Sequence, residues 1–136
     1  MKSHFELTDQ EFEKYFALCK LDPSLFNHEA HLRLAWIHIS KYGLIQAEQN
    51  IMNQLKAFVG SLNEKDKFNT TLTIAAIKMV YHFMCKSNSD NFKNFVMEFP
   101  RLNSNFKELV ASHYGFDIFN SQIAKEHYLT PDLKPF

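Results

Sequence analysis

The sequence predicts an all-α protein: a compact bundle of about five to seven helices that forms a single domain over residues 1–136. Three glycines and four prolines leave little turn material for a fold rich in strands. Apolar residues recur instead at the three- and four-residue spacing of helices. The length is close to the commonest size of one domain, and fourteen phenylalanines supply apolar area for one core.

The first helix is expected to begin after Thr8, which forms a capping box with Glu11. Phe12 and Phe16 follow at the spacing of one helical face. Pro23 ends this helix, because proline disfavours helical backbone in the residue before it.

The second and third helices are expected to be separated by a single glycine. Asn27 is a suitable N-cap for a helix that runs to about Tyr42, where Gly43 stops it. The third helix covers about residues 44–61. Its apolar stripe consists of Leu44, Ala47, Ile51, Leu55, Phe58 and Leu62.

The second half of the chain begins after a charged connector at residues 63–67. A fourth helix over about residues 70–86 is apolar around much of its circumference, which indicates a central position in a bundle. Ser89 is the expected cap of a short fifth helix that Pro100 ends.

Two further helices and an extended tail complete the predicted fold. The sixth helix covers about residues 103–113 and is stopped by Gly115. Ser121 is the expected cap of a last short helix, and residues 130–136 follow it as the tail.

Composition argues against nucleic acids and membranes as partners. The 15 basic and 15 acidic residues cancel, and no basic cluster is present to neutralise phosphates or anionic lipids. The longest apolar stretch, residues 72–85, is interrupted by Lys78 and His82 and is too short to span a bilayer. The N-terminus lacks the apolar segment of a signal peptide, so we expect a cytoplasmic protein. Cys19 and Cys85 are expected to be buried, reduced thiols.

Histidines gather on one face of the second helix. With His28 set at zero and 100° added per residue, His31 lies near −60°, Ala35 near −20° and His38 near −80°. A histidine pair at i and i+3 can direct two imidazole nitrogens toward one metal ion. His38 lies about 10 Å further along the axis than His31, so it can line the same cavity or support the pair from outside the ligand shell, and we do not expect one ion to be bound by all three histidines.

The expected site is incomplete. Near a helix N-terminus the dipole favours a neutral imidazole, the form that binds metal or accepts a proton. Two histidines are nevertheless too few for a zinc or iron site. The candidates for further ligands are Glu48, Asn69, Thr70 and His82. Two alternatives stay open: acid–base chemistry without metal, or histidines that only fill space and bond to neighbouring helix ends.

Three stretches resemble a family of small, uncharacterised, all-helical bacterial proteins. They are F-x-H-x-x-H-L-x-x-A-W at residues 26–36 with Gly43 after it, K-F-N-T-T-L-T at residues 67–73, and the tail at residues 124–135. The resemblance supports the helical fold and the importance of the first two histidines, and it implies no reaction. The second motif in that family commonly reads K-Y-H-E-T, whereas this chain has Asn69 and Thr70 in place of histidine and glutamate. The difference implies two lost donors and reduced or lost activity.

Two functions follow as hypotheses. In the first, the protein binds a divalent metal ion or a small polar ligand through His28 and His31, with His38, Asn69, Thr70 and His82 around the ligand, and whether it is an enzyme stays open. In the second, it is a non-catalytic interaction module or a homo-oligomer. The apolar surface for that second role is expected from Phe92, Phe95, Phe99 and Phe136.

Overall fold

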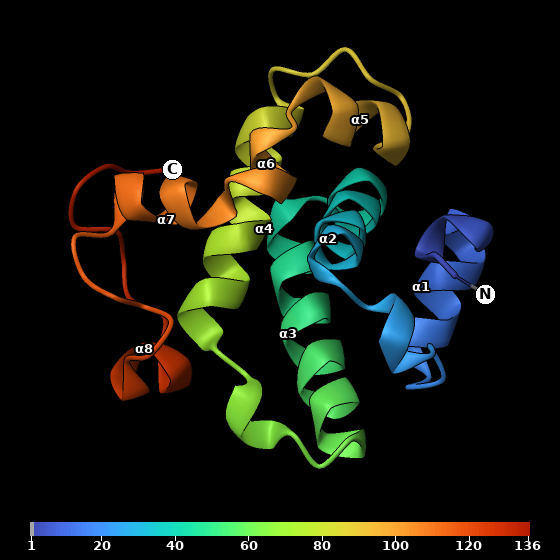
Figure 1. Ribbon diagram of the computed structural model, residues 1–136, viewed down its shortest axis with the longest axis horizontal. Helices are drawn as coiled ribbons and strands as arrows, with labels where there is room; N and C mark the ends of the chain where they lie inside the picture. The colour runs from blue at the N-terminus through green and yellow to red at the C-terminus, as the bar shows by residue number, and fades with distance from the viewer. Residues whose placement is uncertain (1) are drawn as a thin grey trace. The chain divides into compact units, whose positions relative to one another are not determined.

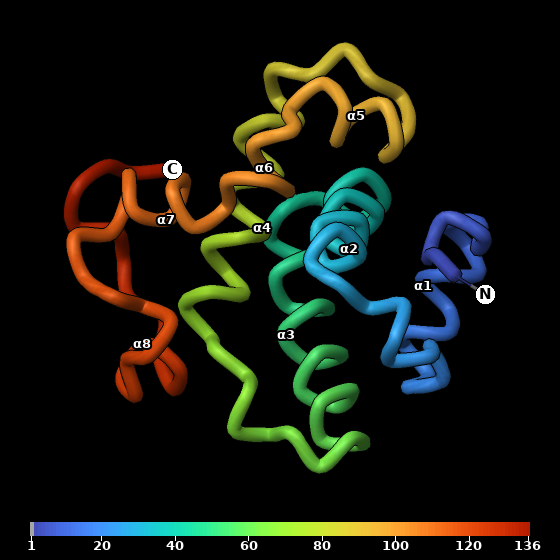
Figure 2. Tube along the Cα trace, in the orientation of Figure 1, coloured from blue at the N-terminus to red at the C-terminus, as the bar shows by residue number. Residues whose placement is uncertain are grey.

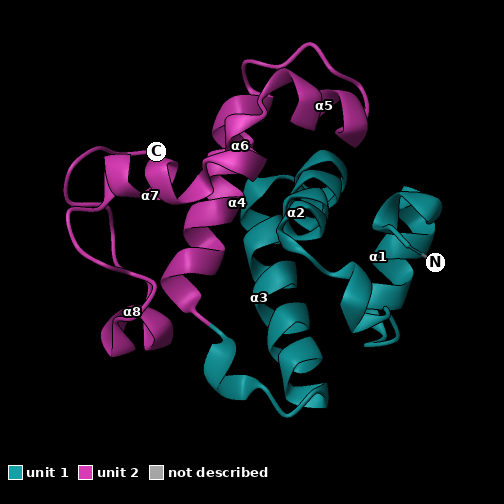
Figure 3. Ribbon diagram, in the orientation of Figure 1, with its two compact units in different colours: residues 1–68 teal, residues 69–136 magenta. Residues whose placement is uncertain are grey.

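A computed structural model describes residues 2–136 and confirms the all-α prediction (Figure 1). This part of the chain contains eight α-helices, three short 3₁₀-helices and no strand. The chain divides into two compact units, one that ends at Phe68 and one that begins at Asn69 (Figure 3). The single-domain organisation stays a prediction.

The first unit contains three α-helices, and the first two begin after the expected caps. The Thr8 hydroxyl accepts from the backbone of Glu11 in a complete capping box, and the Asn27 side chain accepts from the backbone of Ala30. The elements are η1 (His4–Glu6), α1 (Asp9–Ala17), η2 (Pro23–Leu25), α2 (His28–Tyr42), α3 (Leu44–Ser61) and η3 (Lys65–Lys67).

Gly43 alone separates α2 from α3. Its φ of 85° and ψ of 167° belong to a region that only glycine adopts without strain. Its N–H bonds to the carbonyl of Ile39 and closes α2, while its own carbonyl accepts from Ala47 and opens α3. Figure 2 shows α2 nearly end-on and α3 lengthwise, so the two helices cross steeply.

Aromatic rings form the centre of the first unit. Phe12 and Phe16 on α1 are completely buried. The Phe16 ring lies 4.8 Å from the ring of Phe58 on α3 and 4.7 Å from that of Phe26, which precedes α2. Offset and tilted contacts of this kind stabilise beyond the buried area alone. The core therefore fixes the segment just before the histidine face.

The second unit contains the remaining five helices, α4 (Thr70–Met84), α5 (Phe92–Glu98), α6 (Arg101–Ser104), α7 (Phe106–His113) and α8 (Gln122–Glu126). Two expectations were wrong in detail. Asn91, not Ser89, caps α5, because the Ser89 hydroxyl donates to Glu98 instead. The expected helix over residues 103–113 is two helices, because the backbone at Asn105 leaves the helical region.

The start of α4 is tied to segments far along the chain. Asn69 caps α4, because its side-chain oxygen accepts a hydrogen bond from the N–H of Leu72. Its side-chain nitrogen donates a hydrogen bond of 2.8 Å to the carbonyl of Ile118. The hydroxyl of Thr71 donates to the carbonyl of His127 and accepts from the N–H of Leu129. These bonds hold the chain around α8 against the first turn of α4.

Two further expectations concern cysteines and membranes. Cys19 and Cys85 are free thiols as expected, but neither is buried: Cys85 is exposed and Cys19 half-buried at a positive φ of 57°. Among residues 2–136, no helix has both the length and the apolar character that crossing a bilayer requires.

Candidate functional site

His28 and His31 lie in the first turn of α2, immediately after the Asn27 cap. The His28 side chain is half-buried and His31 is exposed by its surface area. The two imidazoles are close enough that a charge on His28 lowers the pKa of His31. The structure therefore brings the predicted pair together on one side of the helix.

The His31 ring is held by an aromatic neighbour. Its centroid lies 3.9 Å from that of Phe26, and the two planes are tilted by 32°. The ring packs against Phe26 although the residue as a whole is exposed. Burial, and secondly His28, lower the pKa of His31 from 6.5 to about 4. The ring is thus neutral at physiological pH and keeps a lone pair for a ligand.

His38 lies apart from this pair. Its side chain is completely buried and contacts Asn50 of α3, whose amide nitrogen lies 3.4 Å from Nδ1. Because that amide donates, the His38 proton belongs on Nε2, which has no hydrogen-bond partner among residues 2–136. The groups that act on its charge are Glu13 and Lys41. His38 therefore stabilises the contact between α2 and α3 and does not complete the His28–His31 pair.

Asn69 and Thr70 begin α4 in the second unit. Asn69 is buried, and both ends of its amide are already used, one for the cap and one for the carbonyl of Ile118. Thr70 is half-buried. A ligand at Asn69 would have to compete with the helix cap for the carbonyl oxygen.

His82 lies at the other end of α4, about 18 Å from Thr70 at 1.5 Å per residue. It is exposed, and its pKa is lowered by partial burial and then by the nearby charges of Lys86, Lys134 and His113. Within the second unit, the three predicted ligand residues therefore do not gather at one point. Residues 2–136 contain no cluster of three or more histidine, cysteine, aspartate or glutamate side chains arranged for a metal ion.

The expectation that Phe92 and Phe95 form an exposed aromatic surface was wrong. Phe92 is 2% exposed and Phe95 is completely buried, because both face inward from α5. Phe99 is half-buried and its ring lies 5.1 Å from that of Phe83. Phe136 lies against the ring of His113, with 4.4 Å between centroids. Phe95 is in ring contact with both Phe92 and Phe99.

Sequence reasoning missed a buried polar network on the other side of α2. Arg33 is 5% exposed and makes five hydrogen bonds: to Asp9 from Nε and Nη2, to the carbonyls of His4 and Leu7, and to Nδ1 of His4. Arginine cannot accept a hydrogen bond, so Nδ1 of His4 accepts and Nε2 donates to Glu29 at 2.8 Å. Burial is the main reason that the pKa of His4 is lowered. The network anchors η1 to α2.

No protein-family profile, curated protein or solved structure matches the chain at a significant level.

Proposed function

We propose that the protein is a small helical binding protein whose ligand is held by the imidazole nitrogens of His28 and His31. A ligand of this site must be able to accept the lone pair of a neutral imidazole nitrogen, by coordination or by a hydrogen bond. A divalent transition-metal ion meets that requirement, and so does a small polar molecule that donates a hydrogen bond. The observation that carries the proposal is the neutral His31 ring, fixed against Phe26 beside a second imidazole and open to solvent.

The proposed site is exchangeable rather than structural. Two imidazoles fill two positions of a zinc centre that prefers four, so water or a small ligand completes the coordination. The resemblance to small bacterial proteins supports the same pair of residues. The replacement of histidine and glutamate by Asn69 and Thr70 agrees with weak binding and with reduced or lost activity. The proposal includes a cytoplasmic location for the protein.

Imidazole nitrogen resonances in NMR test the proposal directly. The full chain is titrated with zinc chloride and, separately, with acetamide and urea as neutral hydrogen-bond donors. We expect selective shifts of His28 and His31, lost in the His28→Ala and His31→Ala variants. His127→Ala is the matched control, because His127 is an exposed histidine at the end of α8.

The two arms separate the two ligand classes. If zinc shifts the His28 and His31 resonances and the two alanine variants abolish the effect, the site binds metal. If only acetamide and urea shift these resonances, the site binds a small polar molecule. If neither probe shifts the pair, or if His127→Ala weakens the response as much as His31→Ala, the proposal is overturned.

A further inference from the structure

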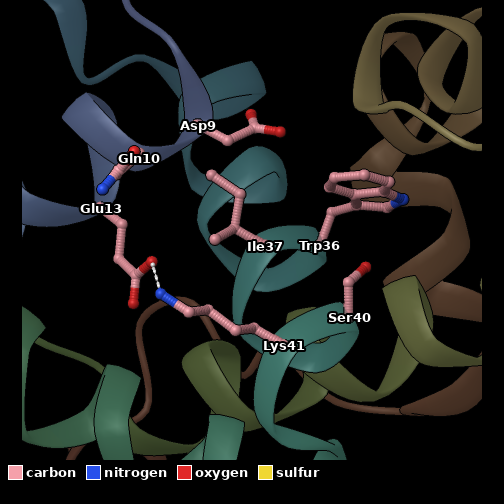
Figure 4. A pocket seen from close by; sticks show the side chains of 7 residues that line it. All are labelled: Asp9, Gln10, Glu13, Trp36, Ile37, Ser40 and Lys41. Atoms are coloured by element: carbon pink, nitrogen blue, oxygen red, sulfur yellow. Dashed lines mark hydrogen bonds and ion pairs between the residues drawn. The ribbon is translucent and has the colours of Figure 1, made fainter.

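A cavity lies between α1 and α2, within the first unit. It has a volume of about 430 Å³, within the range of small-molecule pockets, and is open to solvent. Figure 4 shows its lining, which consists of Asp9, Gln10, Glu13, Trp36, Ile37, Ser40 and Lys41. None of these residues belongs to the His28–His31 pair.

The two helices give the cavity walls of different chemistry. α2 contributes the indole of Trp36 and the buried side chain of Ile37. α1 faces them with two carboxylates, Asp9 and Glu13, and the amide of Gln10. An aromatic face opposite carboxylates suits a ligand that joins an apolar body to a positive charge.

The hydrogen bonds within the walls decide which carboxylate can take a ligand. Both oxygens of Glu13 are occupied, one by Nζ of Lys41 at 2.9 Å and the other by the hydroxyl of Tyr42. Asp9 accepts both Arg33 bonds through a single oxygen, Oδ1. No other described residue bonds to the second oxygen, and the side chain is 49% exposed. In Figure 4 the Asp9 carboxylate is turned to the same side of the cavity as the Trp36 indole.

The same bonds disfavour an anion. Arg33 does not line the cavity, and all five of its donors are used within the protein, so it offers none to a ligand there. The Lys41 ammonium is already paired with Glu13. An incoming cation, by contrast, meets an oxygen that needs no rearrangement.

We propose that this cavity binds a small organic cation, a primary ammonium or guanidinium group on a compact apolar body. The cationic head lies between the second oxygen of Asp9 and the indole of Trp36. The apolar body rests on Ile37. This site is separate from the one at His28 and His31 and does not depend on it.

Trp36 makes the site directly observable, because it is the one tryptophan in the sequence. Selectively excited tryptophan fluorescence reports on this wall alone. The full chain is titrated with three probes of similar size: phenethylamine, phenethyl alcohol and phenylacetate. We expect saturable fluorescence change with the amine, at least about tenfold weaker binding of the alcohol, and no saturation with the acid.

Two pairs of variants localise the signal. Ser40→Leu fills the cavity from an exposed helical position and leaves the Arg33 bonds untouched, with Gln49→Leu on α3 as the matched control. Asp9→Asn removes the carboxylate charge, with exposed Asp66→Asn as its control. We expect about a tenfold loss of amine binding for each cavity variant and none for the controls.

The outcomes are decisive even if Asp9→Asn loosens the fold. Amine binding that survives Ser40→Leu overturns the assignment to this cavity. Equal affinity for the amine and the alcohol overturns the cation requirement. A flat fluorescence titration, together with no heat of binding in calorimetry, overturns the site altogether.

Discussion

Replacement of Arg33 by methionine tests whether the buried network holds the N-terminal segment. Methionine keeps most of the side-chain volume and removes all five donors. Three buried acceptors then each lose a hydrogen bond: the carbonyl of Leu7, Nδ1 of His4, and the carbonyl of His4, which keeps only the N–H of Leu7. At about 1 kcal/mol for each buried acceptor, the free energy of unfolding falls by roughly 3 kcal/mol. The lost bonds to Asp9 should add little to this change, because its half-exposed carboxylate is hydrated by water instead.

The matched comparison is a surface ion pair on the same helix. Lys41 is 55% exposed and pairs with Glu13, so Lys41→Met is expected to leave the free energy of unfolding nearly unchanged. Urea unfolding followed by circular dichroism measures both variants. The Arg33 variant should raise the unfolding equilibrium constant by about 100-fold. If it costs no more than the Lys41 variant, the network does not anchor η1 and the reasoning fails.

Three further predictions concern pH, a helix cap and a backbone position. His31 has a pKa of about 4 in the folded protein against an ordinary 6.5, so the unfolded chain binds the proton more readily. The free energy of unfolding should therefore fall as the pH drops from about 6.5 to 4. Urea unfolding at a series of pH values should show a weaker pH dependence of this free energy for His31→Gln. Asn69→Ala removes a cap and a buried donor and should cost about 2 kcal/mol in thermal or urea unfolding, whereas Asn91→Ala at the exposed cap of α5 should cost about 1 kcal/mol. Gly43→Ala should destabilise by at least about 1 kcal/mol in the same assay, although a methyl group there meets nothing within 4 Å, and an unchanged midpoint would refute the backbone argument.

The sequence predicted best those features that depend on neighbouring residues. The start of α2 after Asn27 and its end at Gly43 were both confirmed, because a cap acts within three or four positions of the helix it closes. Ser89 failed as a cap for the opposite reason. It belongs to a preferred residue type, but its hydroxyl bonds to Glu98, nine positions away.

The candidate site shows the same limit. The chemical type and common face of His28 and His31 could be predicted from spacing alone. The lowered pKa of His31 could not, because it arises from packing that no local pattern reveals. Arg33 gave no signal either, since its partners lie 24 to 29 positions earlier. The cavity between α1 and α2 likewise exists only once two separate helices meet.

The bonds at the start of α4 have a consequence for how the chain is made. Asn69 finds its carbonyl partner 49 residues later, and Thr71 finds its partner 56 residues later. A ribosome must therefore extend the chain past Leu129 before this helix can acquire its final contacts. The first unit draws its own core and buried network from residues up to Phe68. We expect it to form during synthesis, while the second unit waits for residues 118–129 to emerge.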